Sequence, residues 1–385
     1  MHTKNKVREL FEQGNGILRL LPNFVAYKFS KPGFRLKLHP DDYYSFGMNK
    51  GAIKERLLSS VMQSCSSYVD AGDNPVSLRE VVQELGAEII GNDLMEKHGT
   101  WPIHAKFFDY GEPLFHHLHL DFDAAARVGQ LGKPEAYYYP PQMNNYPGTF
   151  PHTYFGFDPS TTKEMVRERL LDFENRDMRI TELSRAFRLQ LGTGWYIPGG
   201  VLHAPGSYCT YEPQWNSSSG AIYENVTAGE VNSMDGIRRS CPEGKENDMD
   251  YIMSLIDWEK NVDPHFKEKY FRPPVVCASE EKTYTEKWIT YNNPYFSAKE
   301  LTVHPGQTVT IKDEAAYGCV FVQGHGKFGG FDAETPTMIR FGQRTADEYF
   351  VSEQAAKKGV TIYNRSQFEP VVVLKHFADN YLYSV

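Results

Sequence analysis

The sequence predicts a mainly β fold, in which two β-domains are joined by helical segments. Three observations carry this prediction. From about residue 285 onward, short runs rich in Val, Ile, Thr and aromatic residues alternate with Gly, Pro and Asn, which is typical of strands and turns. A second strand-like region contains FHHLHLDFD, residues 115–123. Helical spacing is confined to segments near 76–97, 160–177 and 245–270.

The overall composition limits the classes of function. With 385 residues and a hydrophobic share of 41%, the chain can bury a large core. Its net charge of −8 argues against a nucleic-acid partner or an anionic membrane. The five scattered cysteines do not form the pattern of a disulfide framework, and we expect reduced thiols. No leader-like apolar segment or long apolar run is visible, so we expect a cytoplasmic protein.

Two amphipathic helices are expected before residue 180. The first covers 76–97, with Ser77 as N-cap and Glu80 completing a capping box, and it stops near Gly91. Its apolar face holds Leu78, Val81, Val82, Leu85 and Ile89. The second covers 160–177, with Ser160 or Thr161 as its cap. Its stripe consists of Met165, Val166, Arg169, Leu170 and Phe173. Both faces are best explained by core packing.

The segment 115–123 is a candidate metal-binding strand. Alternation along a strand would place His117, His119 and Asp121 on one face, with His116 and the apolar residues on the other. A single histidine is more often structural, but two imidazoles on one face can bind a divalent metal. From this spacing alone, both interpretations stay open. Asp121 is expected to be a turn residue or to orient an imidazole.

A second motif supports the metal interpretation. Residues 192–203, GTGWYIPGGVLH, have the spacing G-x5-P-x-G-x2-H, in which a Pro-Gly turn aims the strand-borne His203 inward. This motif resembles the second signature of cupins, and HLH resembles the start of the first. The resemblance implies two cupin domains, which are jelly-roll β-barrels, with helical insertions and a metal site in the first barrel.

The match becomes more specific over about residues 70–225. The stretch GTWPIHAKFFDYGEPLFHHLHLDFDAAARVGQLGKPEAYYY, residues 99–139, and YEPQWNSS, residues 211–218, resemble class I mannose-6-phosphate isomerases. The resemblance implies four metal ligands, which are His117, His119, Glu135 and His203. The family usually has glutamine at the first of these positions. We therefore expect one divalent metal ion, foremost Zn²⁺, with Mn, Fe, Ni and Co as alternatives.

The same resemblance implies which residues handle protons and bind the sugar. Lys133, in GKPE, and Glu212, in YEPQ, become the catalytic candidates. A lysine ammonium beside a divalent cation loses proton affinity, which suits acid or base catalysis. Tyr137 and Gln214 become candidate substrate-binding residues, and Tyr139 shares the strand face of Tyr137.

Two departures from the family affect the choice of substrate. An arginine usual in the family is replaced near Ala221 and Ile222, and Phe115 replaces a serine beside the metal strand. If that arginine normally stabilises charge on the enediol, we expect slow turnover of mannose 6-phosphate, unless Arg238 or Arg239 folds back over the site or the true substrate is a different sugar, for example an unphosphorylated one.

These features predict a domain organisation and a function. We expect a metal-binding cupin domain over 1–244, a helical connector over 245–284 and a metal-free cupin-like barrel over 285–385. The predicted function is that of a metal-dependent aldose–ketose isomerase for a hexose or hexose phosphate, such as mannose 6-phosphate. The alternatives are an iron-dependent cupin oxygenase and a non-catalytic sugar-binding cupin. The partner is a small sugar or sugar phosphate, with no nucleic acid and no membrane.

Overall fold

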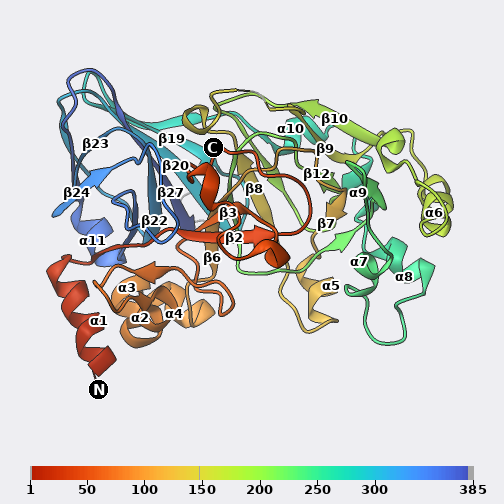
Figure 1. Cartoon of the computed structure of the whole chain (residues 1–385), viewed down its shortest axis with the longest axis horizontal. Coiled ribbons are helices and arrows are strands. Elements are labelled where there is room, and N and C mark those ends of the chain that lie inside the picture. The colour runs from red at the N-terminus through yellow and green to blue at the C-terminus, as the bar shows by residue number, and fades with distance from the viewer. Residues whose placement is uncertain (1, 147, 380–385) are drawn as a thin grey trace.

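The structure is a computed structural model that describes residues 2–146 and 148–379. Strands dominate it, and they form two β-barrels that lie next to each other along the long axis of the molecule (Figure 1). The C-terminal barrel lies at the left of Figure 1, and the barrel that carries the histidines lies at the centre and right. The predicted mainly β, cupin-type fold is confirmed.

The first barrel consists of two sheets. The larger has the order β17 (Phe271–Arg272), β11 (Gly194–Ile197), β8 (Glu135–Tyr138), β13 (Thr210–Trp215), β6 (Ile103–Phe108), β3 (Ala52–Leu58) and β2 (Asn23–Tyr27). The smaller has the order β10 (Ser184–Arg188), β9 (His152–Phe157), β12 (His203–Ala204), β7 (His117–Leu118) and β14 (Ala221–Ile222). Two short pairs accompany them, namely β4 (Tyr68–Val69) with β5 (Val76–Ser77), and β15 (Val226–Thr227) with β16 (Glu230–Val231).

The second barrel also consists of two sheets. The larger has the order β1 (Ile17–Arg19), β25 (Glu348–Val351), β22 (Tyr317–Gln323), β27 (Val371–Ala378), β20 (Phe296–Val303), β19 (Tyr284–Thr290) and β18 (Val275–Glu280). The smaller contains β21 (Thr308–Ile311), β26 (Val360–Asn364), β23 (His325–Phe328) and β24 (Phe331–Glu334). The region expected to be strands and turns after about residue 285 consists mainly of strands, but it also contains helix α11 (Glu353–Lys358).

One strand from the N-terminal region completes the second barrel. β1 pairs antiparallel with β25, so that Leu18 lies opposite Phe350. Strand β18, at 275–280, also belongs to this barrel, although it precedes residue 285. The division of the chain at 244 and 284 stays a prediction. Sheet membership differs from these boundaries at β1, at β18 and at β17, which lies in the expected connector but belongs to the first barrel.

Strand alternation gives the large sheet of the first barrel two different faces. In β6, Ala105 and Phe107 pack among residues of both barrels, whereas His104 and Lys106 line a cavity inside the first barrel. Arg56 of β3 reinforces the contact between barrels, because it forms a buried ion pair with Asp347 at 2.8 Å. The cavity-lining groups therefore stand on a sheet whose back is fixed by the second barrel.

The helix expected over 76–97 is three short helices, α2 (Leu78–Leu85), α3 (Ala87–Ile90) and α4 (Asn92–His98). Its beginning was predicted correctly, because Ser77 and Glu80 form the capping box. The prediction of one continuous helix was wrong, although a helix does end at Gly91 as expected. Gly86 and Gly91 both have positive φ, 52° and 89°, and each ends a helix. At Gly91 it is this backbone conformation that favours glycine, and a Cβ there would also lie 2.4 Å from a carboxylate oxygen of Glu353 in α11, whose side chain would have to move.

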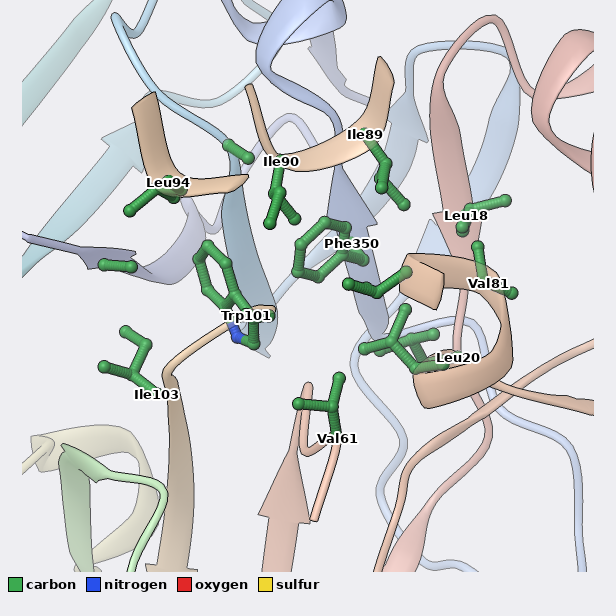
Figure 2. Close-up of a cluster of buried hydrophobic side chains, with 14 of the residues drawn as sticks. Leu18, Leu20, Val61, Val81, Ile89, Ile90, Leu94, Trp101, Ile103 and Phe350 are labelled. Carbon is green, nitrogen blue, oxygen red and sulfur yellow. The ribbon is translucent and has the colours of Figure 1, made fainter. Parts of the chain in front are cut away.

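These three helices pack on the junction between the barrels (Figure 2). Figure 2 shows Ile89, Ile90 and Leu94 above Trp101 and Phe350, and the last two rings meet edge to face at 5.0 Å. The cluster also includes Leu18 and Leu20 from the N-terminal segment that adds β1. Helix α1 (His2–Gln13) packs on the outside of this layer. One apolar core thus holds the helices and both barrels together.

The second predicted helix is α6 (Lys163–Leu171), and its cap is Thr162, not Ser160 or Thr161. Thr162 Oγ1 accepts from the backbone N–H of Met165 at 3.3 Å. Val166 and Leu170 are buried as expected, whereas Met165 is exposed. The segment expected to be helical at 245–270 contains α8 (Met249–Ser254), α9 (Trp258–Asn261) and α10 (Phe266–Tyr270), and α7 (Asp235–Arg238) precedes them.

Two further expectations concern thiols and membranes. All five cysteines are free. Within 2–146 and 148–379, the helices lack the length and apolar character that crossing a membrane requires.

Candidate active site

Strand pairing brings the histidines of the two sequence motifs together. His117 of β7 lies directly opposite His203 of β12, and their ring centroids are 4.2 Å apart. His119 follows β7 by one residue, with its ring 5.0 Å from His117 and 5.2 Å from His203. One nitrogen of each of these rings lies within 4.8 Å of the other two, which is a geometry that could hold a metal ion.

The backbone fixes the tautomer of all three rings. The Nδ1 atoms of His117, His119 and His203 lie 3.0, 2.7 and 2.9 Å from the carbonyl oxygens of Phe115, Ser219 and Val201. A carbonyl oxygen only accepts, so each Nδ1 carries the proton. Each Nε2 is left with a lone pair, as in metal-binding histidines whose other nitrogen donates to a backbone carbonyl.

Glu135 completes a set of four inward-facing acceptors. It lies in β8 on the opposite sheet, is buried, and places its two oxygens 3.0 Å from Nε2 of His119 and Nε2 of His203. Because those nitrogens carry lone pairs, neither can donate to the carboxylate. Oε1 lacks a hydrogen-bond donor among the described residues, and Oε2 lies 2.9 Å from the ammonium of Lys133. Three imidazoles and a carboxylate are the donor set of zinc and related transition metals, so these residues fit a metal ion.

The protonation states agree with this interpretation. Burial, and then the neighbouring rings of His203 and His119, hold the pKa of His117 well below its usual value. Burial and then Lys133 lower the pKa of His119 to about 4. Burial alone would raise the pKa of Glu135, but Lys133 and His119 outweigh it and hold that pKa well below 4.5. The rings of His117 and His119 are therefore neutral, and the carboxyl group of Glu135 is ionised.

His117, His119 and Glu135 line a cavity of about 310 Å³, which is within the range of small-molecule sites, whereas His203 is fully buried and does not line it. Lys133 precedes β8 and does not lie in the strand, but its ammonium still points to the site, 2.9 Å from Glu135 and 2.9 Å from Nε2 of His119. Glu212 lies inside β13 and is 2% exposed, so it is a buried carboxyl group and not a solvated surface group. Its Oε1 is 3.7 Å from Lys133. Both catalytic candidates thus line the same cavity.

Burial gives Glu212 an unusual proton affinity. Desolvation, and then repulsion by the Glu135 carboxylate, raise the pKa of Glu212 to about 8, although Lys106 and Lys133 act in the opposite direction. Glu212 is therefore the more easily protonated of these two carboxyl groups. Two carboxyl groups whose environments separate their pKa values are typical of acid–base sites.

The candidate substrate-binding residues have mixed outcomes. Tyr137 and Gln214 both line the cavity, and Gln214 Nε2 donates to Nε2 of His104 at 2.8 Å. Tyr139 does not line the cavity but lies in the adjacent apolar core.

The prediction that Asp121 shares a strand face with His117 and His119 is wrong, because β7 ends at Leu118. Asp121 instead caps α5 (Phe122–Ala126), where its side chain accepts from Ala124 N at 2.7 Å.

The structure separates the two arginines that the sequence left as alternatives. Arg239 lines the cavity, and its Nε donates to the carbonyl oxygen of Gly220 at 3.2 Å. Arg238 points away, to Asp235 and Glu174 at 3.3 and 3.4 Å. Ile222 and Phe115 also line the cavity, so the two departures from the family pattern both face its interior.

Sequence reasoning missed a charged group beside the predicted residues. Lys106 lies 2.9 Å from Glu55 and 3.5 Å from Glu212, and both line the cavity with it. Burial opposes its charge, but Glu212 and Glu55 outweigh burial and raise the pKa of Lys106 well above its usual value. Tyr27 and Tyr110 donate to Glu55 at 3.0 and 2.8 Å. The signal was the alternation of β6, in which His104 and Lys106 are polar positions between apolar ones.

The fold and this site define a cupin-type β-barrel protein with a buried cluster of three histidines that could bind a metal. The mannose 6-phosphate isomerase from Bacillus subtilis has a similar structure, with a TM-score of 0.62 and 17% identity over 93% of this chain and 99% of that one. A variant of the phosphomannose isomerase from Salmonella typhimurium has a TM-score of 0.66 and 11% identity over 95% and 100%. The sequence itself matches no protein-family model and no curated protein. The resemblance to the class I mannose-6-phosphate isomerases is therefore confirmed in the fold of nearly the whole chain.

Proposed function

We propose that this protein is a metal-dependent aldose–ketose isomerase that acts on a hexose or hexose phosphate, as in the interconversion of mannose 6-phosphate and fructose 6-phosphate. One observation carries the proposal. Three of the four acceptors, from His117, His119 and Glu135, line a sugar-sized cavity together with the acid–base candidates Lys133 and Glu212, and the fourth, His203, lies against His117. The similar isomerase structures support it at the level of the fold.

In this proposal the four acceptors hold one divalent metal ion, with Zn²⁺ as the first choice. When bound, the ion supplies Lewis-acid polarisation of the carbonyl and hydroxyl oxygens of the open sugar. Glu135 is held between two neighbouring strands, because it lies opposite Gln214 of β13 and opposite Ile197 of β11. The hydrogen bonds from each Nδ1 hold the imidazole rings in their orientation.

The chain's own groups carry the proton movement. Isomerisation takes a proton from C2 of the aldose and returns one to C1, through a cis-enediol. Glu212, whose pKa burial raises, is placed to donate a proton to O1 of the sugar and to take one back from O2, and Lys133, 3.7 Å away, is the candidate base that takes the proton from C2 and returns it to C1. Lys106 keeps its charge and stabilises negative charge that develops on the enediol. Tyr137 and Gln214 contact the sugar from β8 and β13. As part of the same proposal, the enzyme works in the cytoplasm on a small sugar or sugar phosphate, and it has no nucleic-acid partner and no membrane partner.

The test is incubation of the metal-loaded protein with a panel of aldoses and aldose phosphates in D₂O, followed by proton NMR. Isomerisation would replace hydrogen by deuterium at the exchanged carbon and produce the ketose. An oxygen electrode run in parallel addresses the cupin oxygenase alternative, which consumes O₂ and forms no ketose. Binding of a sugar without exchange, ketose or oxygen uptake would instead favour the non-catalytic sugar-binding alternative.

A further inference from the structure

A second cavity lies between the two barrels. This inter-barrel cavity has a volume of about 660 Å³, compared with about 310 Å³ for the cavity beside the histidines. It is lined by residues within 142–146 of the first barrel, within 322–325 and 334–337 of the second, and within 34–37, a segment between β2 and β3. Among the described residues, none lines both cavities. The space has the size of a small-molecule site and is separate from the candidate active site.

Lys37 brings an unpaired cation to the inter-barrel cavity. Its ammonium donates to the carbonyl oxygen of Val322 at 3.3 Å, and it forms no ion pair with any of the described residues. Burial lowers the pKa of Lys37 to about 8, and the Asp347 carboxylate, which opposes this effect, is itself paired with Arg56. A half-buried ammonium without a carboxylate partner is costly, so the site favours an anion that would complete it.

The other charged groups of the inter-barrel cavity limit the ligand to a single negative charge. Arg35 lines the cavity as well, but its guanidinium forms a buried ion pair with Asp109 at 2.6 Å. Glu334 and Glu369 also line the cavity, and both are exposed. One unpaired ammonium together with two carboxylates favours a monoanion, because a dianion would be repelled more strongly than the one cation attracts it.

Neutral polar side chains add hydrogen-bonding groups to the same space. Gln142, Asn145 and Gln323 present side-chain amides, and Thr335 presents a hydroxyl group. Oε1 of Gln142 and Oγ1 of Thr335 are buried, and neither has a hydrogen-bond partner within 2–146 and 148–379. Unpaired buried polar atoms are costly, which indicates that a ligand or water completes them. Amides both donate and accept, and hydroxyl groups of a ligand do the same.

The segment that carries Lys37 is held in a strained conformation. Phe34 and Lys37 have positive φ angles of 62° and 60°, which are unfavourable for residues other than glycine. Such a conformation persists only where the surrounding structure imposes it. Here Ile339 of the second barrel donates its backbone N–H to the carbonyl oxygen of Lys37 at 2.7 Å, and it accepts from the N–H of His39 at 2.9 Å. The ammonium therefore has a defined origin between the barrels.

We propose that the inter-barrel cavity is a second ligand-binding site, which takes a polyhydroxylated monocarboxylate with its carboxylate on Lys37. The hydroxyl groups of this ligand bind the amides of Gln142, Asn145 and Gln323. Such a ligand contacts segments of both barrels. The inference does not depend on the proposed isomerase activity, because the site shares no lining residue with the candidate active site among the described residues.

D-Gluconate is the probe, because it carries one carboxylate and several hydroxyl groups. It is titrated calorimetrically into metal-loaded wild type, Lys37→Met and Lys50→Met. We expect the affinity of one site to fall at least about tenfold in Lys37→Met, since a hydrogen bond to a charged group is lost. Lys50→Met, at an exposed lysine of the same segment, should bind as wild type does. Gluconate can also chelate a metal, so the titration is repeated with His203→Ala, in which the Lys37-dependent site should persist. Equal binding to wild type and Lys37→Met, or no binding to either, would overturn the proposal.

Amine labelling of the wild-type protein places the ligand without any substitution. Lysines are acetylated with acetic anhydride at neutral pH, and peptide mass spectrometry measures the extent at each position. Saturating gluconate should slow the acetylation of Lys37 at least about fivefold and leave Lys50 unchanged. Mannitol, which has hydroxyl groups but no carboxylate, should protect Lys37 much less. Equal labelling of Lys37 with and without gluconate would show that the ligand does not bind there, and equal protection by mannitol would show that the carboxylate is not what Lys37 recognises.

Discussion

His117 and His203 lie directly opposite each other on neighbouring antiparallel strands, with their rings 4.2 Å apart. They belong to motifs that are far apart in the sequence, so the site exists only when β7 and β12 are paired. A metal that binds both rings would therefore stabilise the folded first barrel.

The purified protein is expected to hold about one divalent metal ion per chain, and His203→Ala should lose most of it because the substitution removes one of four ligands. Elemental analysis by mass spectrometry measures the content. His325→Ala, in the second barrel and partly exposed, is the control and should keep the metal. His117→Ala provides a second test if His203→Ala folds poorly. Equal metal content in wild type and both site variants would show that the ligands are wrong.

Much of the candidate site could be predicted, because its signals are local. The spacing of His117 and His119 and the turn before His203 can be read from short stretches, and the resemblance supplied Glu135 and Lys133. Periodicity in 76–97 correctly marked a buried helical face. It correctly indicated the stop near Gly91 but not the break at Gly86, because the apolar spacing continues through this residue to Ile89 while its backbone turns to a positive φ of 52°.

The missed features are all products of tertiary structure. Lys106 became part of the site only because β6 lies beside β13, which aligns it with Glu212. β1 joins the second barrel because the N-terminal segment crosses to β25. No local pattern around Ile17–Arg19 contains that information. Alternation can tell that a polar side chain faces away from the core, but it cannot tell which other strand it will meet.

Lys133→Met is expected to lower turnover by at least about a hundredfold, the scale of a general acid or base, while metal content stays close to that of wild type. The substitution retains most of the volume of the buried side chain. Turnover is measured by the appearance of the ketose, and metal content by elemental analysis. Lys31→Met, at an exposed lysine, is the control. Full activity of the Lys133 variant would remove this residue from the mechanism, and Glu212→Gln would then test the remaining candidate.

The junction between the helices and the barrels should be a major source of stability. Phe350 is fully buried against Trp101, so Phe350→Ala should cost about 3–5 kcal/mol of the free energy of unfolding. Phe368 is 94% exposed, and Phe368→Ala should change it by less than about 0.5 kcal/mol. Urea denaturation of both variants measures the difference. Similar costs at the two positions would contradict the assigned core.

Acid should destabilise the protein through a histidine that is buried in its neutral form. His376 of β27 is fully buried, and its Nδ1 lies 2.8 Å from the hydroxyl of Tyr211, across the junction of the barrels. Burial, and then the nearby His104, lower the pKa of His376 to about 3, whereas the unfolded chain should titrate near pH 6.5. Between these values the unfolded state binds the extra proton, so stability is complete above about pH 6.5 and falls as the pH drops. Between pH 6.5 and pH 4 this group alone should cost about 3 kcal/mol. Urea denaturation at a series of pH values measures the loss.

His376→Gln should be less stable at pH 7, because it disturbs the contact with Tyr211, but its stability should depend less steeply on pH. His325→Gln, at a partly exposed position, should keep the wild-type slope. Parallel pH profiles for wild type and His376→Gln would show that this histidine does not drive the acid transition.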